Sequence, residues 1–354
     1  MACNVYFCTM KLSGLIFFRT ARIALILTLL VILAGSVVRV TQSGMGCPDW
    51  PRCFGYYIPP TVETEVRFQP NRQYNKGMMV IERDTLWRAK AGFTATSTFD
   101  AADWEKYPKH DYASFVVYQT WVEYINRLLG ALLGLVILAL VIFSFRFRKT
   151  KPLLVFYSLV LLVLTGFQAW LGKLVVDGNL IPQSVSIHML AALVILWVLI
   201  LILYGKESAA PRIGNKLVST LAIVLVGVTT LQILIGTQVR EEIDELAEIT
   251  GFLDRSTWIE SLSSVFTLHK LFSLTVAAVC AIIFIQRKHI KDSWLKNSAI
   301  LLAFVLLAEI GLGLIMTYGE VPRFAQSLHL LFSTMLFCMG GRIYLGTRVG
   351  AISN

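Results

Sequence analysis

Eight long apolar runs constrain the fold of this chain more than any other feature of its sequence. They lie near residues 22–40, 122–145, 152–176, 185–204, 216–239, 265–286, 294–317 and 327–347. About 20 apolar residues are enough for a helix to cross a bilayer, so each run predicts a membrane-spanning helix. A soluble globular fold is excluded, because 56% of the 354 residues are hydrophobic and only 15% are charged. We therefore expect an all-α membrane protein with eight transmembrane helices.

Charge along the chain predicts how these helices are oriented. Basic residues precede the first run and follow the second, fourth, sixth and eighth runs, which places all of them on one side of the membrane. They are Lys11, Arg19, Arg22, Arg146, Arg148, Lys149, Lys151, Lys206, Arg212, Lys216, Arg287, Lys288, Lys291, Lys296, Arg342 and Arg348. The opposite side carries an acidic loop within residues 241–260. Because Lys and Arg gather on the cytoplasmic side, both termini are expected in the cytoplasm. The net charge of +10 is then an orientation signal, and nucleic acid binding is not expected.

The runs form two sets of four, and polar residues recur at matching places in the two sets. The matched positions are Arg39 with Arg240, Asn126–Arg127 with His269–Lys270, Gln168 with Glu309, Gly172 with Gly313, and His188 with His329. Four helices per half give both halves the same orientation, which is a parallel internal duplication. We therefore expect two tandem four-helix bundles, comprising residues 1–208 and 209–354.

A long outer loop, residues 41–118, interrupts the first half. It opens with SGMGCPDWPRCFGYYIPP, in which Cys47 and Cys53 lie six residues apart. Conditions outside the cytoplasm allow these two cysteines to form a disulfide. The middle of the loop, residues 62–111, has balanced charge, which is compatible with a small ordered insertion. We assign no secondary structure to it.

Three of the five histidines stand in the first turn of a run, namely His188, His269 and His329. A single histidine at such a position is as well explained by a polar bridge between helices as by a function. Three at matched repeat positions favour axial ligands of heme iron near the outer face of the membrane. His269 and His329 form a complete ligand pair in the second half. The first half offers only His188, because Asn126 stands at the partner position.

Four cations lie near the same outer ends of the helices: Arg39, Arg127, Arg240 and Lys270. Heme carries two propionates, which such side chains bind well. For Arg39 and Arg240, anchoring to lipid headgroups is an equal alternative.

Glu123 is the residue that most strongly suggests catalysis. It precedes Asn126 by one helical turn, whereas the second half has Phe266 at this position. A carboxylate beside a heme edge can act as a general base or stabilise a developing cation. The alternative is an ion pair with Arg127, four residues further along the same helix. The two roles are compatible. One half thus has a carboxylate with an incomplete ligand pair, and the other has two ligands without a carboxylate.

The segments VRVTQSGMGCPDWPRC, EYINRLLG and FQAWLGKLVVDG, together with His269 and His329, resemble the heme A synthase family over nearly the whole chain. The resemblance implies oxidation of the C8 methyl of heme O to the formyl group of heme A. It also implies a heme b held by His269 and His329 in the second bundle, with the substrate heme in the first. By the same resemblance Glu123 is the catalytic glutamate, and Cys47–Cys53 is an outer-loop disulfide.

The chain departs from the family pattern in three places. Many members have a histidine where this chain has Asn126, so we expect a substrate heme with the single protein ligand His188, either five-coordinate or water-ligated. His110 is a weaker candidate for the second ligand. The chain also lacks the cysteine pair that some bacterial members carry between the fifth and sixth runs, and the insertion 62–111 has no counterpart in the pattern.

The resemblance further implies a multi-pass protein of the bacterial plasma membrane. Heme O is its expected substrate, and a heme O synthase (protoheme farnesyltransferase) and subunit I of cytochrome oxidase are candidate partners. A homo-oligomer is left open. The main alternative function is a diheme b-type cytochrome that passes electrons to or from quinone. That alternative explains the histidines, but it explains neither Glu123 nor the single ligand of the first half.

Overall fold

The computed structural model of the protein describes residues 2–108, 114–177, 184–207, 216–251, 255–290 and 293–348. Its α-helices are α1 (Ala2–Val40), α2 (Val117–Ser144), α3 (Pro152–Asp177), α4 (Ser184–Glu207), α5 (Lys216–Ile249), α6 (Trp258–Ser261), α7 (Ser264–Gln286), α8 (Ser293–Tyr318) and α9 (Arg323–Arg348). Among the described residues, 8 helices are long and apolar enough to cross a membrane, and only α6 is too short. The expectation of eight spanning helices is confirmed, and the chain is a multi-pass membrane protein.

Local sequence accounts for where several helices begin and end. Pro152 opens α3, a position where its fixed φ and missing N–H cost nothing. The Ser263 side chain caps α7 by accepting from the Val265 N–H at 3.1 Å. Helix α5 has 34 residues and is about 51 Å long at 1.5 Å per residue, well beyond a core of about 30 Å. Residues 240–249, expected in an acidic loop, instead continue this helix.

The outer loop contains a small β-fold that the expected all-α class does not include. Its strands are β1 (Gln73–Tyr74), β2 (Met79–Glu82), β3 (Thr85–Ala89), β4 (Phe93–Thr94) and β5 (Trp104–Lys106). Strands β2, β3 and β5 form one antiparallel sheet, and β1 pairs antiparallel with β4. Arg83 and Asp84, both with positive φ, form the two-residue turn between β2 and β3. Tyr74 and Trp104 are fully buried between the sheets, so the insertion has an aromatic core of its own.

The chain divides into two compact units. The first comprises Met1–Leu33, Ala131–Gln168 and Val185–Asn354, and the second comprises Ala34–Gly130 and Ala169–Ser184. The second unit therefore contains the outer loop with the adjoining ends of α1, α2 and α3.

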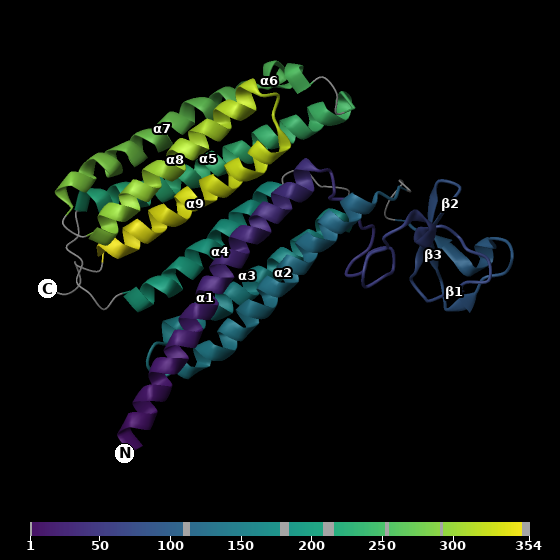
Figure 1. Ribbon diagram of the computed structural model, residues 1–354, viewed down its shortest axis with the longest axis horizontal. Coiled ribbons are helices and arrows are strands. Elements are labelled where there is room, and N and C mark those ends of the chain that lie inside the picture. Colours follow the sequence, from purple (N-terminus) through teal and green to yellow (C-terminus); the bar gives the residue numbers. More distant parts are fainter. Residues whose placement is uncertain are drawn as a thin grey trace. The chain divides into compact units, whose positions relative to one another are not determined.

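Within the first unit, α5, α7, α8 and α9 form a helical bundle (Figure 1). Helix α5 packs against α7 and α9, and α8 packs against the same two helices. Val218, Cys280, Leu302 and Leu336 contribute one residue from each helix to its core. A separate core joins parts of α1, α2, α3 and α4. His110, Arg212, Asp254 and Lys291 lie outside the described residues.

Candidate functional site

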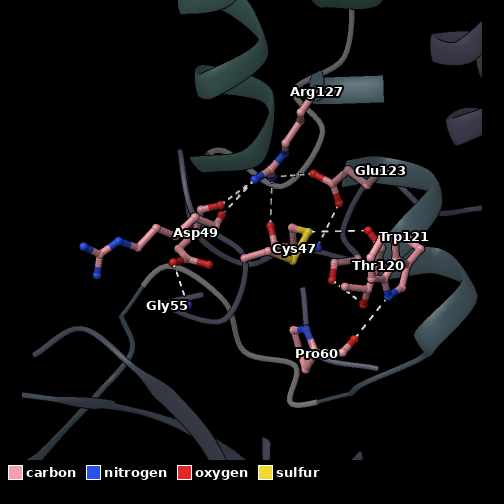
Figure 2. Close-up of a disulfide and its surroundings, with 11 residues drawn as sticks. Cys47, Asp49, Gly55, Pro60, Thr120, Trp121, Glu123 and Arg127 are labelled. Atoms are coloured by element: carbon pink, nitrogen blue, oxygen red, sulfur yellow. Dashed lines mark hydrogen bonds and ion pairs between the residues drawn. A yellow bond between two sulfur atoms is a disulfide. The ribbon is translucent and has the colours of Figure 1, made fainter. Parts of the chain in front are cut away.

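The Glu123 carboxylate lies at the centre of a network that joins the outer loop to the start of α2 (Figure 2). Glu123 is 4% exposed. Its Oε1 accepts from Arg127 at 2.5 Å, and its Oε2 accepts from the backbone N–H of Cys47 at 2.8 Å. The ion pair that the spacing of these residues allowed is therefore present. A charged hydrogen bond and a backbone donor together offset part of the cost of burying this carboxylate.

Arg127 binds the loop as well as Glu123. Its guanidinium donates to the carbonyls of Asp49 at 2.7 Å, Arg52 at 3.1 Å and Cys47 at 3.1 Å. Three carbonyls from a seven-residue turn thus converge on one side chain. The planar, multiply donating guanidinium suits such a cluster, whereas the point charge of lysine would not. We call Glu123, Arg127 and the turn 47–53 the loop latch.

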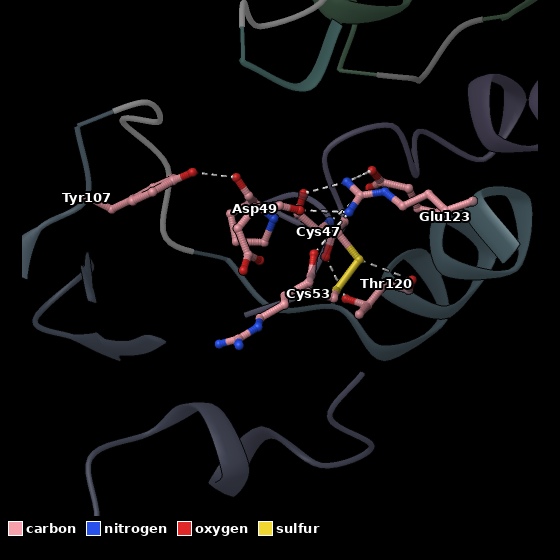
Figure 3. Close-up of polar contacts among 10 residues, drawn as sticks. Cys47, Asp49, Cys53, Tyr107, Thr120 and Glu123 are labelled. Carbon is pink, nitrogen blue, oxygen red and sulfur yellow. Dashed lines mark hydrogen bonds and ion pairs between the residues drawn. A yellow bond between two sulfur atoms is a disulfide. The ribbon is translucent and has the colours of Figure 1, made fainter. Parts of the chain in front are cut away.

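Further contacts hold the latch against α2. The Cys47–Cys53 disulfide closes the turn. The Thr120 hydroxyl donates to the Gly46 carbonyl at 2.8 Å, and the Trp121 indole donates to the Pro60 carbonyl at 3.3 Å. From the other side, the Tyr107 hydroxyl donates to the Pro48 carbonyl at 2.9 Å (Figure 3).

Gly46 lets the turn approach the helix closely. A Cβ added there would lie 2.6 Å from the Gln119 carbonyl carbon and 2.7 Å from the Thr120 nitrogen, both of which are backbone atoms. No larger residue fits without moving the turn, so the glycine fixes how close the latch lies to α2.

Asp49 carries the second carboxyl group of the latch. Its Oδ2 accepts from the Gly55 N–H at 2.9 Å, and its Oδ1 is buried without a hydrogen-bond partner among the described residues. Burial raises the pKa of this carboxyl above its ordinary value of 3.8, despite the bond from Gly55 and the nearby charge of Arg127.

Asn126 lies one turn after Glu123 and faces α1. A Cβ added at Gly35 would lie 3.9 Å from the Asn126 Oδ1, and that oxygen has no hydrogen-bond partner among the described residues. A buried, unpaired amide oxygen is unusual enough to indicate a site for another group. His188 belongs to the other unit. The amide of Gln168 donates to the His188 backbone carbonyl at 2.9 Å, and the His188 Nδ1 has no partner among the described residues.

His269 on α7 and His329 on α9 face each other inside the second bundle. Their ring centroids lie 6.3 Å apart, with an interplanar angle of 64°. A metal–imidazole bond is about 2.0–2.1 Å long and the ring radius is about 1.1 Å, so two rings on opposite sides of one iron have centroids about 6 Å apart. The observed spacing therefore fits a bis-histidine heme. No cluster of three or more His, Cys, Asp or Glu that could hold a bare metal ion occurs among the described residues.

Glycines make room for both rings. A Cβ at Gly236 on α5 would lie 3.1 Å from the His269 Cε1, and one at Gly313 on α8 would lie 3.6 Å from the His329 Cε1. The amide of Gln232 donates to the His269 carbonyl at 3.0 Å and lies 3.3 Å from its Nε2. These residues, together with Glu309 beside His329, are additions to the predicted site. Glu309 could have been found from the sequence, because a carboxylate within a membrane span is costly unless it has a role.

The predicted propionate-binding cations have different surroundings. Arg127 belongs to the loop latch. Arg240 pairs with Asp244 at 2.6 Å, one turn further along α5. Lys270 is exposed, with its ammonium 4.4 Å from the centre of the Phe266 ring. Arg39 is partly buried in the last turn of α1.

A family model described as cytochrome oxidase assembly protein, COX15-CtaA, matches residues 19–87 and 85–339. Among curated proteins, the heme A synthase of Rickettsia prowazekii is 26% identical over 346 residues, covering 89% of this chain and 95% of that protein. The heme A synthase of Ehrlichia canis is 25% identical over 341 residues, covering 88% of this chain and 87% of that protein. That of Shewanella oneidensis is 27% identical over 245 residues, covering 68% of this chain and only 62% of that protein. Since the family match extends over most of its length, the chain belongs to the COX15-CtaA family of cytochrome oxidase assembly proteins.

Proposed function

We propose that this protein is a heme A synthase, which oxidises the C8 methyl of heme O to the formyl group of heme A. The family match from residue 19 to residue 339 carries this assignment. Relatives that match 86–89% of the chain, among them those of Rickettsia prowazekii and Ehrlichia canis, bear the same name.

A parallel duplication underlies the two halves, residues 1–208 and 209–354. Two pairs of equivalent contacts support it. Gly35 faces Asn126 as Gly236 faces His269. The side chain of Gln168 contacts His188, and that of Glu309 contacts His329. The basic residues on one side place both termini in the cytoplasm, with the heme sites near the outer face of a bacterial plasma membrane.

His269 and His329 hold a resident heme b in the second half, as their ring spacing and the facing glycines support. Lys270 and Arg240 meet its propionates. When bound, such a heme accepts and releases single electrons. The protein's own contribution is to fix the two rings and to exclude other ligands from the bundle core.

His188 is the single protein ligand of the substrate heme in the first half, and Asn126 does not bind the iron. Arg39 and Arg127 bind the propionates of this heme. Glu123 acts at the methyl group, where it accepts a proton or stabilises the cation that forms as electrons leave. The loop latch supports this role, because Arg127 and the Cys47 N–H hold the carboxylate in one position. A fixed charge stabilises a developing cation without reorganising first.

A heme O synthase is the proposed supplier of heme O, and subunit I of cytochrome oxidase is the proposed recipient of heme A. A homo-oligomer is compatible with this function. The diheme b-type cytochrome is the second candidate function, because a bis-histidine pair alone would serve an electron carrier. The two functions differ in product: only the synthase makes heme A.

Pigment analysis of membranes that contain the protein and a heme O source tests the proposal. We expect new heme A with the wild-type protein, and bound heme without heme A in the Glu123→Ala variant. Thr120→Val is the matched control, because it removes a latch hydrogen bond worth about 1 kcal/mol and leaves the carboxylate in place. Heme b alone in the wild type would favour the electron carrier. Normal heme A output from Glu123→Ala would refute the catalytic role of Glu123.

A further inference from the structure

Glu309 on α8 is an ionisable residue within a membrane span that the proposed chemistry does not use. Its side chain is only 12% exposed, and its Oε1 lies 3.2 Å from the Nδ1 of His329. Neither Oε2 nor the histidine Nδ1 has a hydrogen-bond partner among the described residues. The carboxylate and the ring nitrogen are thus within hydrogen-bonding reach after a small rotation. The Ser333 side chain is a second hydrogen-bonding neighbour of Glu309.

The equivalent residue of the first half is different. Gln168 replaces the carboxylate with a neutral amide, and this amide binds the backbone carbonyl of His188 at 2.9 Å instead of the ring. Two histidines at matched positions therefore have unlike neighbours. The difference separates the half assigned to substrate from the half assigned to the resident cofactor.

The contact also selects which nitrogen of His329 faces the metal. With Nδ1 directed at Glu309, a proton on Nδ1 would leave the lone pair of Nε2 for iron. Histidine ligands commonly donate their other N–H to a carboxylate in this way, which fixes the ring and raises its basicity.

We propose that Glu309 is a positioning residue that orients His329 and lowers the reduction potential of the heme iron bound in the second half. This inference rests on the proposed bis-histidine heme. A carboxylate that accepts from Nδ1–H increases the electron density at Nε2, which stabilises ferric over ferrous iron. A heme held there by His269 and His329 would be harder to reduce with Glu309 in place than without it. Among the described residues of the first half, Gln168 takes the place of this carboxylate beside His188.

Redox titration of the purified protein, followed by the visible absorption of its low-spin heme, tests the proposal. The variant Glu309→Gln keeps the size of the side chain and removes its charge. We expect it to retain the low-spin bis-histidine spectrum, with a reduction equilibrium shifted about tenfold toward ferrous heme, or about 59 mV for one electron. The matched control is Glu320→Gln, which removes the same charge from an exposed residue beyond α8 and should leave the potential unchanged.

An unchanged potential in Glu309→Gln, or an equal shift in Glu320→Gln, would overturn the proposal. If Glu309→Gln loses its heme, Glu309→Asp replaces it: the charge stays but lies one methylene further from Nδ1, and an intermediate potential is expected. Wild-type potential in Glu309→Asp would then overturn the proposal. A wild-type protein without low-spin heme would instead overturn the cofactor assignment on which the proposal rests. Absence of heme A together with the expected shift would refute the synthase and leave the role of Glu309 standing.

Discussion

At the scale of single residues, Glu123 has a structural and a chemical role that reinforce each other. Both oxygens of its carboxylate are bonded, one to Arg127 and one to the Cys47 N–H. Removing either donor would leave a buried charge with too few partners, which costs several kcal/mol. Variants at Arg127 therefore report on the position of the proposed catalytic carboxylate as well as on the proposed heme contact.

Asp49 makes the stability of the loop latch depend on pH. Because burial raises the pKa of its carboxyl above 3.8, the folded latch binds the proton more tightly than the unfolded chain does. The contribution of Asp49 to the stability of the latch is therefore fully present below pH 3.8, is lost as the pH rises through the raised pKa, and levels off above it. One proton allows a slope of at most about 1.4 kcal/mol per pH unit. Hydrogen exchange of the amides at 46–55, corrected for intrinsic rates, measures this local stability.

The Asp49→Asn variant should lose this pH dependence, since its amide cannot ionise. Asp103→Asn is the control, because Asp103 is exposed in the same loop and should leave the profile of the latch unchanged. A pH profile that is the same in Asp49→Asn and in the wild type would assign the dependence to another group.

At the scale of elements, the position of the turn 47–53 against α2 depends on Gly46. The Gly46→Ala variant would push a methyl group into the backbone of Gln119 and Thr120, a misfit that typically costs about 1–3 kcal/mol. We expect faster exchange of the Cys47 amide, which Glu123 otherwise protects, and lower heme A output with heme still bound.

Gly92→Ala provides the comparison within the same loop. A Cβ at Gly92 would lie 3.7 Å from the Tyr74 carbonyl, an ordinary van der Waals contact. This variant should show the same exchange of the Cys47 amide and the same heme A output as the wild type. Equal exchange in both alanine variants would contradict the close approach at Gly46.

The sequence predicts the spanning helices well because their signal is local: a long apolar run must satisfy its backbone within itself in a membrane. The extension of α5 was not predicted, since Glu241, Glu245 and Glu248 look like a polar loop although glutamate is a good helix former. The β-fold was not predicted either, because its strands are only two to five residues long and their pairing is not local.

The site was predicted in part. Glu123, His188, His269 and His329 stand out because polar residues are costly in spans. The carbonyl cluster around Arg127 is invisible in sequence, since every residue has a carbonyl and only the folded turn directs three of them at one guanidinium.

At the scale of the whole molecule, the two halves share an architecture and differ in their polar residues. The second half has two facing histidines with a carboxylate beside one of them. The first half has Asn126, Gln168 and, within its spanning helices, the single histidine His188, together with Glu123 and its latch. On the proposed duplication, such a difference between the halves suits a resident redox group and an exchangeable substrate: two strong ligands would retain a heme, and one ligand would let it leave.

The Asn126→His variant tests whether the substrate heme has one protein ligand and the resident heme has two. A histidine at position 126 has Gly35 opposite it, as His269 has Gly236, so the ring has room beside α1. We expect a second low-spin heme signal per chain by electron paramagnetic resonance, tighter retention of heme O or heme A, and slower release of product. Adding Gly35→Val to Asn126→His should abolish the new signal, because the valine side chain would occupy the space of the ring. If the wild-type protein already shows two bis-histidine hemes, and Asn126→His adds nothing, the single-ligand substrate site is wrong.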